Sequence, residues 1–117
     1  MNRQVLGETG ERLARAYLTR RGLKVLAANH RSRLGEVDLI CLDAGTIVFV
    51  EVKTRTTGRF GPPAAAVDFR KQDRLRRLAE EYVIANHLES APVRFDVLSI
   101  IYAPPASPEL EYIPGAF

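Results

Sequence analysis

The segment 47–55, with the sequence IVFVEVKTR, opens with four apolar residues, continues with a glutamate, a valine and a lysine, and ends with two more polar residues. Successive side chains of a strand point to opposite faces, so Glu51 and Lys53 share one face with Ile47 and Phe49. The other face carries Val48, Val50 and Val52. The pattern predicts a buried strand that ends with an acid and a base roughly 7 Å apart on one face. Such a pair is also typical of the solvated rim of a strand, so the neighbouring elements must decide its meaning.

Periodicity elsewhere predicts two helices and three more strands. The first helix is expected from about Arg3 to Arg21, with Gly22 as its stop, and the second from the capping Asp68 to about Leu88. The buried stripe of the second helix is expected to contain Leu75, Leu78, Ala79, Tyr82 and Ala85. The other strands are expected at residues 23–29, 36–43 and 93–102. This αβββαβ order predicts an α/β sandwich with a central mixed sheet.

The end of the chain, APPASPELEYIPGAF, is rich in proline and is expected to be irregular. We therefore divide the chain into a domain of residues 1–103 and a tail of residues 104–117 that packs on or beside it. Leu110, Tyr112 and Phe117 are the side chains expected to pin this tail.

Ala44 and Gly45 separate two of the predicted strands by the two residues of a tight hairpin loop. With this loop, Asp43 pairs with Thr46, which fixes the register of the whole hairpin. Alanine is an unfavourable residue for such a turn, so a one-residue shift or a bulge stays an alternative.

In this register two acids face each other across the hairpin. Asp38 falls opposite Glu51 and Glu36 opposite Lys53, so two carboxylates roughly 5 Å apart would repel each other. A hard divalent cation is the ordinary compensation, and Mg²⁺ accepts one or two carboxylates while keeping several waters. Such an ion leaves room for a phosphate oxygen and an attacking water. Lys53 would hold that water or a phosphate oxygen and offset the negative charge that develops in the reaction. The arrangement is typical of phosphodiester cleavage.

Both helices carry further candidates. Glu11 lies at the edge of the apolar stripe of the first helix, where an i, i+4 pair with Arg15 is an equally good interpretation. Lys71 heads the buried line of the second helix and is expected to point toward the sheet. The candidates for phosphate contact, for which a solvated basic face is the alternative, are Arg59 in the loop and Arg70, Arg74 and Arg77 on the second helix.

Composition narrows the class of protein. The chain has 17 Lys and Arg against 14 Asp and Glu, and all of the bases lie at or before Arg94. This excess of positive charge is compatible with a surface that binds nucleic acid, but it is also compatible with a charge that only keeps the protein soluble. The single cysteine, Cys41, cannot form an intramolecular disulfide and suits a reducing compartment. No apolar run has the length of a signal-peptide core or a membrane span. We therefore expect a cytoplasmic protein without a membrane partner.

A wider pattern resembles a known family. It combines Gly7, Gly10 and Glu11 with GEVDLI, VFVEVKTR, FG, Lys71 and the ending AF, and it is similar to the YraN-like family of uncharacterised small bacterial proteins. The resemblance covers nearly the whole chain. That family is similar to the restriction-endonuclease-like superfamily with the PD-(D/E)xK signature, in particular to archaeal Holliday junction resolvases. The resemblance implies a restriction-endonuclease-like αβββαβ core and a metal-dependent nuclease site.

The resemblance also implies roles for single residues. Glu11 matches the helix glutamate of the resolvases, Asp38 the signature aspartate, Glu51 the following acid and Lys53 the signature lysine. The implied catalytic set is thus these four residues. Mg²⁺ or Mn²⁺ would be held by Asp38, Glu51 and the backbone carbonyl of Val52.

Two positions depart from or extend the signature. Val37 stands where the signature has proline, which weakens the motif without removing the site. Glu36 belongs to the YraN-like pattern and is treated as a neighbour of the site without an assigned role. Arg59, Arg70, Lys71 and Arg74 are the candidates for nucleic-acid binding.

The expected function is that of a metal-dependent endonuclease that hydrolyses DNA, with branched or damaged DNA as substrate. Resolvase-like enzymes act as dimers, so the resemblance implies a homodimer, although no apolar patch of this sequence identifies its face. Two other classes stay open. One is a non-catalytic nucleic-acid-binding or partner-binding module on the same fold, and the other is a protein-interaction domain whose basic charge serves solubility.

Overall fold

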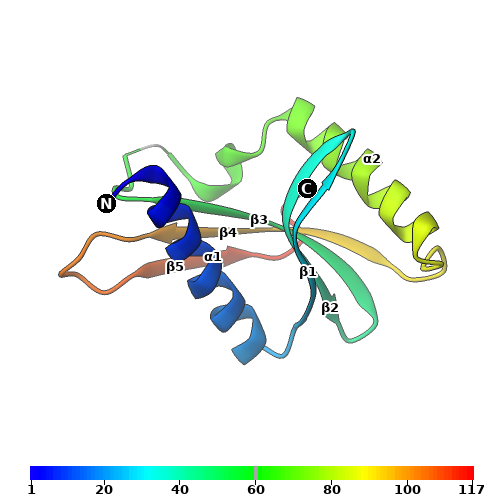
Figure 1. Ribbon diagram of the computed structural model, residues 1–117, viewed down its shortest axis with the longest axis horizontal. Coiled ribbons are helices and arrows are strands. Elements are labelled where there is room, and N and C mark those ends of the chain that lie inside the picture. Colours follow the sequence, from blue (N-terminus) through cyan, green and yellow to red (C-terminus); the bar gives the residue numbers. More distant parts are fainter. Residues whose placement is uncertain (60) are drawn as a thin grey trace.

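The computed structural model describes residues 1–59 and 61–117 (Figure 1). Phe60, part of the FG motif, lies outside the described residues. Within the described parts the elements are α1 (Arg3–Arg20), β1 (Lys24–Ser32), β2 (Gly35–Asp43), β3 (Thr46–Arg55), the 3₁₀ turn η1 (Pro63–Ala66), α2 (Phe69–Ala85), β4 (Val93–Ile101) and β5 (Glu109–Ile113).

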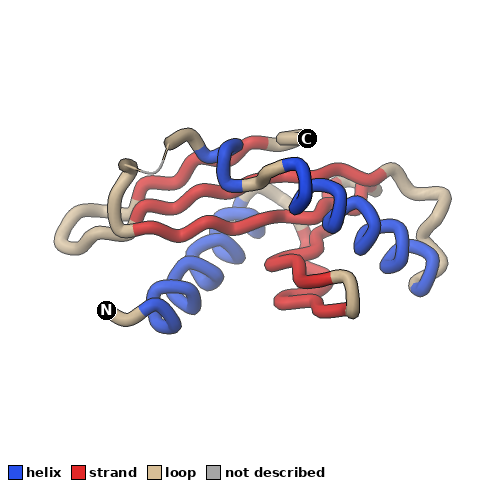
Figure 2. The backbone as a smooth tube through the Cα atoms, turned by 90° about the horizontal axis from the view of Figure 1, so that it is seen from above, coloured by secondary structure: helices blue, strands red, loops and turns tan. Residues whose placement is uncertain are grey.

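The strands form one mixed sheet in the order β1-β2-β3-β4-β5. β3 and β4 run parallel, joined by the crossover through α2, while the other neighbours are antiparallel. The two helices pack on opposite faces of the sheet, since α1 and α2 contribute to separate apolar clusters (Figures 1 and 2). The predicted mixed α/β fold is confirmed.

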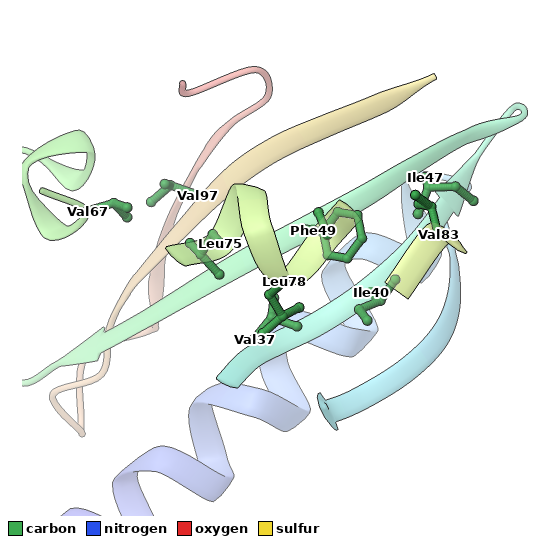
Figure 3. Close-up of a cluster of buried hydrophobic side chains, with 10 residues drawn as sticks. Val37, Ile40, Ile47, Phe49, Val67, Leu75, Leu78, Val83 and Val97 are labelled. Atoms are coloured by element: carbon green, nitrogen blue, oxygen red, sulfur yellow. The ribbon is translucent and has the colours of Figure 1, made fainter. Parts of the chain in front are cut away.

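The alternation along β3 sorts its side chains as predicted. Val48 and Val50 are buried with Leu18 of α1 in one cluster, and Val52 packs against it. The opposite side of β3 gives Ile47 and Phe49 to the cluster beneath α2, drawn in Figure 3. Because one strand feeds both cores, its register is fixed by burial on both faces.

The hairpin between β2 and β3 also has the predicted register. Asp43 pairs with Thr46, and Ala44 and Gly45 adopt φ values of 47° and 91°. Positive φ at both central residues is what a type I′ turn requires. The shifted register that alanine left open is therefore not formed.

The second helix ends earlier than predicted, at Ala85 instead of about Leu88. The backbone N–H and the side-chain amide of Asn86 both donate to the Tyr82 carbonyl, and His87 has a φ of 56°, which stops the helix. Ala85 is exposed and Val83 is buried, so the prediction of Ala85 in the buried stripe is wrong. Position 83 follows Ala79 by four residues and therefore lies on the same, buried side of the helix, whereas position 85 does not.

The proline-rich tail is not irregular throughout. Residues 109–113 form β5, which pairs with β4 in spite of the flanking prolines. Leu110 and Tyr112 pack on the apolar cluster beneath α1, and Phe117 stacks on Phe95 with ring centroids 5.1 Å apart. The three pinning side chains are confirmed, but the boundary at residue 104 separates a strand from its own sheet.

A buried carboxylate anchors this last strand. Asp96 of β4 has no exposed surface, and it accepts hydrogen bonds from Arg94, from the Tyr112 hydroxyl and from the Gly115 N–H. Arg94 also donates to Asp43 at 2.9 Å, which ties the end of β2 into the same network. These hydrogen bonds compensate the burial of charge, so the network serves the fold and not the candidate site.

Candidate functional site

β2 separates from β3 beside Asp38. In the described part of the chain the ladder ends with the pair of Leu39 and Val50, and the Asp38 Oδ2 instead accepts a hydrogen bond from the Val52 N–H at 2.7 Å. A side-chain carboxylate thus takes the place of the next backbone partner. The edge of β3 beyond this point is open to a ligand.

The rest of β2 stays paired with β1 and turns toward α2. Val37 joins the cluster beneath α2 (Figure 3), although Leu39 lies in the cluster beneath α1. Figure 2 shows the tip of this hairpin apart from the other strands. Glu36 consequently pairs with Arg31 of β1 at 3.0 Å, and the predicted pairing of Glu36 opposite Lys53 is wrong.

Asp38 and Glu51 come together as predicted. Glu51 is buried, with 8% of its surface exposed, and its carboxylate shares a hydrogen bond with that of Asp38. Burial, reinforced by the negative charge of Glu51, raises the pKa of Asp38 to about 7, against the opposing effects of the Val52 N–H and Lys71. The pair therefore forms a half-buried acidic centre that retains a proton near neutral pH.

The raised pKa predicts how stability depends on pH. Between pH 4 and about 7 the folded protein binds a proton at Asp38 that the unfolded chain releases, so this group's contribution to stability falls as pH rises through that window. Asp38→Asn should remove the fall, which is a few kcal/mol at most. Urea unfolding in EDTA at pH 5 and pH 8 measures it, with Asp73→Asn on the surface of α2 as the control. Parallel pH profiles for wild type and Asp38→Asn would contradict the assignment.

Two cavities meet at Asp38. The α2-side cavity, of about 240 Å³, lies between the hairpin tip and α2 and is lined by Glu51, Lys71 and Arg74 among others. The α1-side cavity, of about 550 Å³, is lined by residues of α1, β1 and the end of β3. Asp38 and Glu36 border both cavities. A ligand centred on Asp38 can therefore extend to both sides of the hairpin.

Lys53 and Glu51 open into different cavities. Lys53 is exposed and lines the α1-side cavity together with Asp38 and Thr54, whereas Glu51 lines the α2-side cavity. Residues 51 and 53 stand two apart on a strand that keeps its regular register with β4, so the predicted shared face of the strand is kept although the two residues line different cavities. Asp38 is the residue that connects the two.

Glu11 of α1 lies in the α1-side cavity. Its Oε1 accepts a hydrogen bond from the Asn29 side chain at 2.9 Å, and in the described residues no ion pair with Arg15 forms. α1 comes close to β3 next to this residue, since a Cβ on Gly10 would overlap the Thr54 side chain. Nothing in the sequence pattern singled out Asn29, whose φ of 51° turns β1 at this point.

Two of the predicted basic candidates, Lys71 and Arg74, line the α2-side cavity, and the other three line neither cavity at Asp38. Lys71 points toward the sheet as predicted, and its ammonium lies 2.7 Å from Glu51. Arg74 lines the α2-side cavity, Arg59 and Arg70 are exposed, and Arg77 pairs with Asp73. The sequence interpretation missed Arg3 and Arg31, which line the α1-side cavity. Arg31 belongs to a visibly basic segment, HRSRLG, which was the available signal.

The donors at this centre fit a hard cation. Among the described residues no group of three or more His, Cys, Asp and Glu side chains could hold a metal, so the ligand set would be Asp38, Glu51 and backbone oxygen. The Val52 N–H faces Asp38, and the carbonyl of the same strand residue is expected to face the same open edge. Two carboxylates, one carbonyl and water are donors that Mg²⁺ accepts.

Comparisons with known proteins connect the chain to proteins of unstated activity. Residues 10–100 match the model of a family described as "Uncharacterised protein family UPF0102". A UPF0102 protein of Solibacter usitatus is 47% identical over 113 residues, which cover 95% of this chain and 84% of the relative. One of Geobacter metallireducens is 44% identical over 117 residues, covering 100% and 95% of the two chains.

No described helix is long and apolar enough to cross a membrane.

Proposed function

The chain belongs to the uncharacterised protein family UPF0102, the YraN-like family that its sequence resembles, and we propose that it is a metal-dependent endonuclease. The single observation that carries the proposal is the carboxylate pair of Asp38 and Glu51 at an open strand edge between two cation-lined cavities. We also propose that the fold is restriction-endonuclease-like and related to that of the archaeal resolvases. The order of elements and the position of the acids on β2 and β3 support it.

The residues divide the chemistry between them. Asp38, Glu51 and the Val52 carbonyl would hold Mg²⁺ or Mn²⁺, which supplies positive charge to a phosphate oxygen and lowers the pKa of a bound water. Lys53, on the α1 side of Asp38, positions the attacking water or offsets negative charge that develops on the phosphate. Glu11, oriented by Asn29 in the same cavity, accepts a proton or a hydrogen bond from that water.

The lining of the cavities supports a polymeric substrate. Arg3, Arg31 and Lys53 line the α1-side cavity, and Lys71 and Arg74 line the α2-side cavity. Cations on both sides of the carboxylates suit a phosphodiester chain that continues past the cleaved bond in both directions, as an endonuclease requires. We propose DNA as this chain.

Cleavage of DNAs of different shape tests the proposal. Linear, flapped and four-way DNA, with a single-stranded RNA for comparison, would be incubated with the protein in Mg²⁺, in Mn²⁺ and in EDTA. We expect internal cuts in at least one DNA with metal and none in EDTA. Cuts that persist in EDTA, or intact substrates under all metal conditions, would refute the function.

Binding of DNA should weaken steeply with salt, because Lys and Arg contacts release counterions from phosphates. Arg74→Ala should reduce the slope of log affinity against log salt by about one. Fluorescence anisotropy in EDTA measures the slope, and Arg20→Ala, at the other end of α1 from the site, is the matched control. Arg59→Ala and Arg70→Ala test the two other predicted contacts. Affinity that does not change between low and physiological salt would remove the physical basis of DNA binding.

One observation favours a second candidate, a non-catalytic nucleic-acid-binding or partner-binding module. Lys71 neutralises Glu51 without any metal. A module of this kind would bind DNA with the predicted salt dependence and leave it intact in Mn²⁺. The cleavage experiment therefore separates the two candidates.

A further inference from the structure

Lys71 is the cation that contacts the buried acid of the site. Its Nζ lies 2.7 Å from the Glu51 Oε1, and Glu51 keeps only 9% of its side-chain surface exposed. The lysine is held at the start of α2, where its backbone N–H donates to the capping Asp68. Its position is thus fixed by the helix terminus, while its side chain reaches into the sheet.

The two lysines of the site are not equivalent. Lys53 is exposed and lines the α1-side cavity, whereas Lys71 lines the α2-side cavity together with Glu51. Lys71 is within ion-pair distance of Glu51, and its positive charge also acts on Asp38. The ammonium group that pairs with Glu51 in the free protein therefore comes from α2.

We propose that Lys71 holds Glu51 in the free protein as a built-in competitor of the divalent ion, so that a metal binds only by displacing the ammonium group. The inference rests on the proposed metal site. It assigns a function to a residue that lies outside the E-x-K motif on β3.

Elementary electrostatics supports the exchange. A buried carboxylate requires a compensating cation, and two cations on the same carboxylate oxygen repel each other. Lysine carries its charge on a flexible four-carbon stem, and a third of the Lys71 side chain, 34%, is exposed. The adjoining cavity of about 240 Å³ has room for the displaced ammonium, and the Glu36 carboxylate lines it. Displacement therefore needs no change of the backbone.

Lys71→Met tests the inference, because methionine keeps the length of the side chain and removes its charge. Calorimetric titration of the free protein with Mn²⁺ should show roughly tenfold tighter binding than wild type, the effect of removing one competing charge. Lys71→Arg keeps the charge and should bind as weakly as wild type. Arg77→Met removes a charge from the same helix away from Glu51 and should bind like wild type.

The outcomes separate this inference from the proposed function. A purely structural role for Lys71 predicts unchanged or weaker Mn²⁺ binding in Lys71→Met, and that result, with wild type binding metal, would overturn the inference alone. Absence of Mn²⁺ binding in wild type and both Lys71 variants would overturn the metal site and the inference together. Circular dichroism before each titration verifies that the variant is folded. If Lys71→Met is unfolded, Lys71→Gln takes its place with the same expected tightening.

Discussion

Asp38→Asn is expected to abolish divalent-metal binding and DNA cleavage together. The asparagine amide has no negative charge, so the metal loses one of its two carboxylate ligands. The other, Glu51, remains in its ion pair with Lys71. Cleavage should fall by at least about a thousandfold, the upper range seen when one stabilising donor is lost from an active site. Calorimetric Mn²⁺ titration beside a cleavage assay measures both effects.

The fold should survive this change. The asparagine side-chain oxygen can still accept the hydrogen bond that the Val52 N–H donates to Asp38. Stability in EDTA should hold or rise at pH 8, because the variant removes the repulsion between Asp38 and Glu51. Asp73→Asn is the control for the loss of a carboxylate elsewhere. An Asp38→Asn protein that binds Mn²⁺ as tightly as wild type would show that this carboxylate is not a metal ligand.

Lys53→Ala should separate metal binding from catalysis. A protonated lysine has no lone pair for a metal, so its loss should leave Mn²⁺ affinity unchanged. The cleavage rate should fall by on the order of a hundredfold, since a group that positions water or offsets transition-state charge is gone. Single-turnover cleavage at saturating DNA measures the rate without the effect of weaker DNA binding.

Lys24→Ala is the matched control, because Lys24 is an exposed lysine on β1 that lines neither of the two cavities at Asp38. It should cleave at the wild-type rate. If Lys53→Ala also cleaves at that rate, Lys53 belongs to the solvated rim of β3 and takes no part in the reaction.

The part of the fold that rests on local pattern could be predicted from the sequence. Alternation along β3 identified both of its faces, since Val48 and Val50 are buried on one and Phe49 on the other. The two-residue turn fixed the register that brings Asp38 to Glu51. Such features depend on neighbouring residues in the chain, and a pattern of apolar and polar positions records them.

The remaining features depend on contacts between distant segments. No periodicity marks the place where β2 leaves β3, so the partner of Glu36 was misassigned. Asn29 reaches Glu11 across 18 positions of the chain, and Lys71 reaches Glu51 across 20. β5 was missed because prolines dominate the segment that contains it, although its pairing with β4 needs only five residues. Tertiary packing decides these four features: the separation of β2 from β3, the two long-range side-chain contacts and the pairing of β5. A single sequence carries information on tertiary packing only indirectly.

The central claim is that a metal at Asp38 and Glu51 cleaves phosphodiester bonds. The measurement that tests it most directly compares wild type with Asp38→Asn, purified in parallel, on the same branched DNA in Mn²⁺ and in EDTA. We predict internal cuts by wild type in Mn²⁺ alone, and intact DNA with Asp38→Asn under both conditions. Equal cutting by the two proteins, or no cutting by wild type in Mn²⁺ while it still binds the DNA, would contradict the claim.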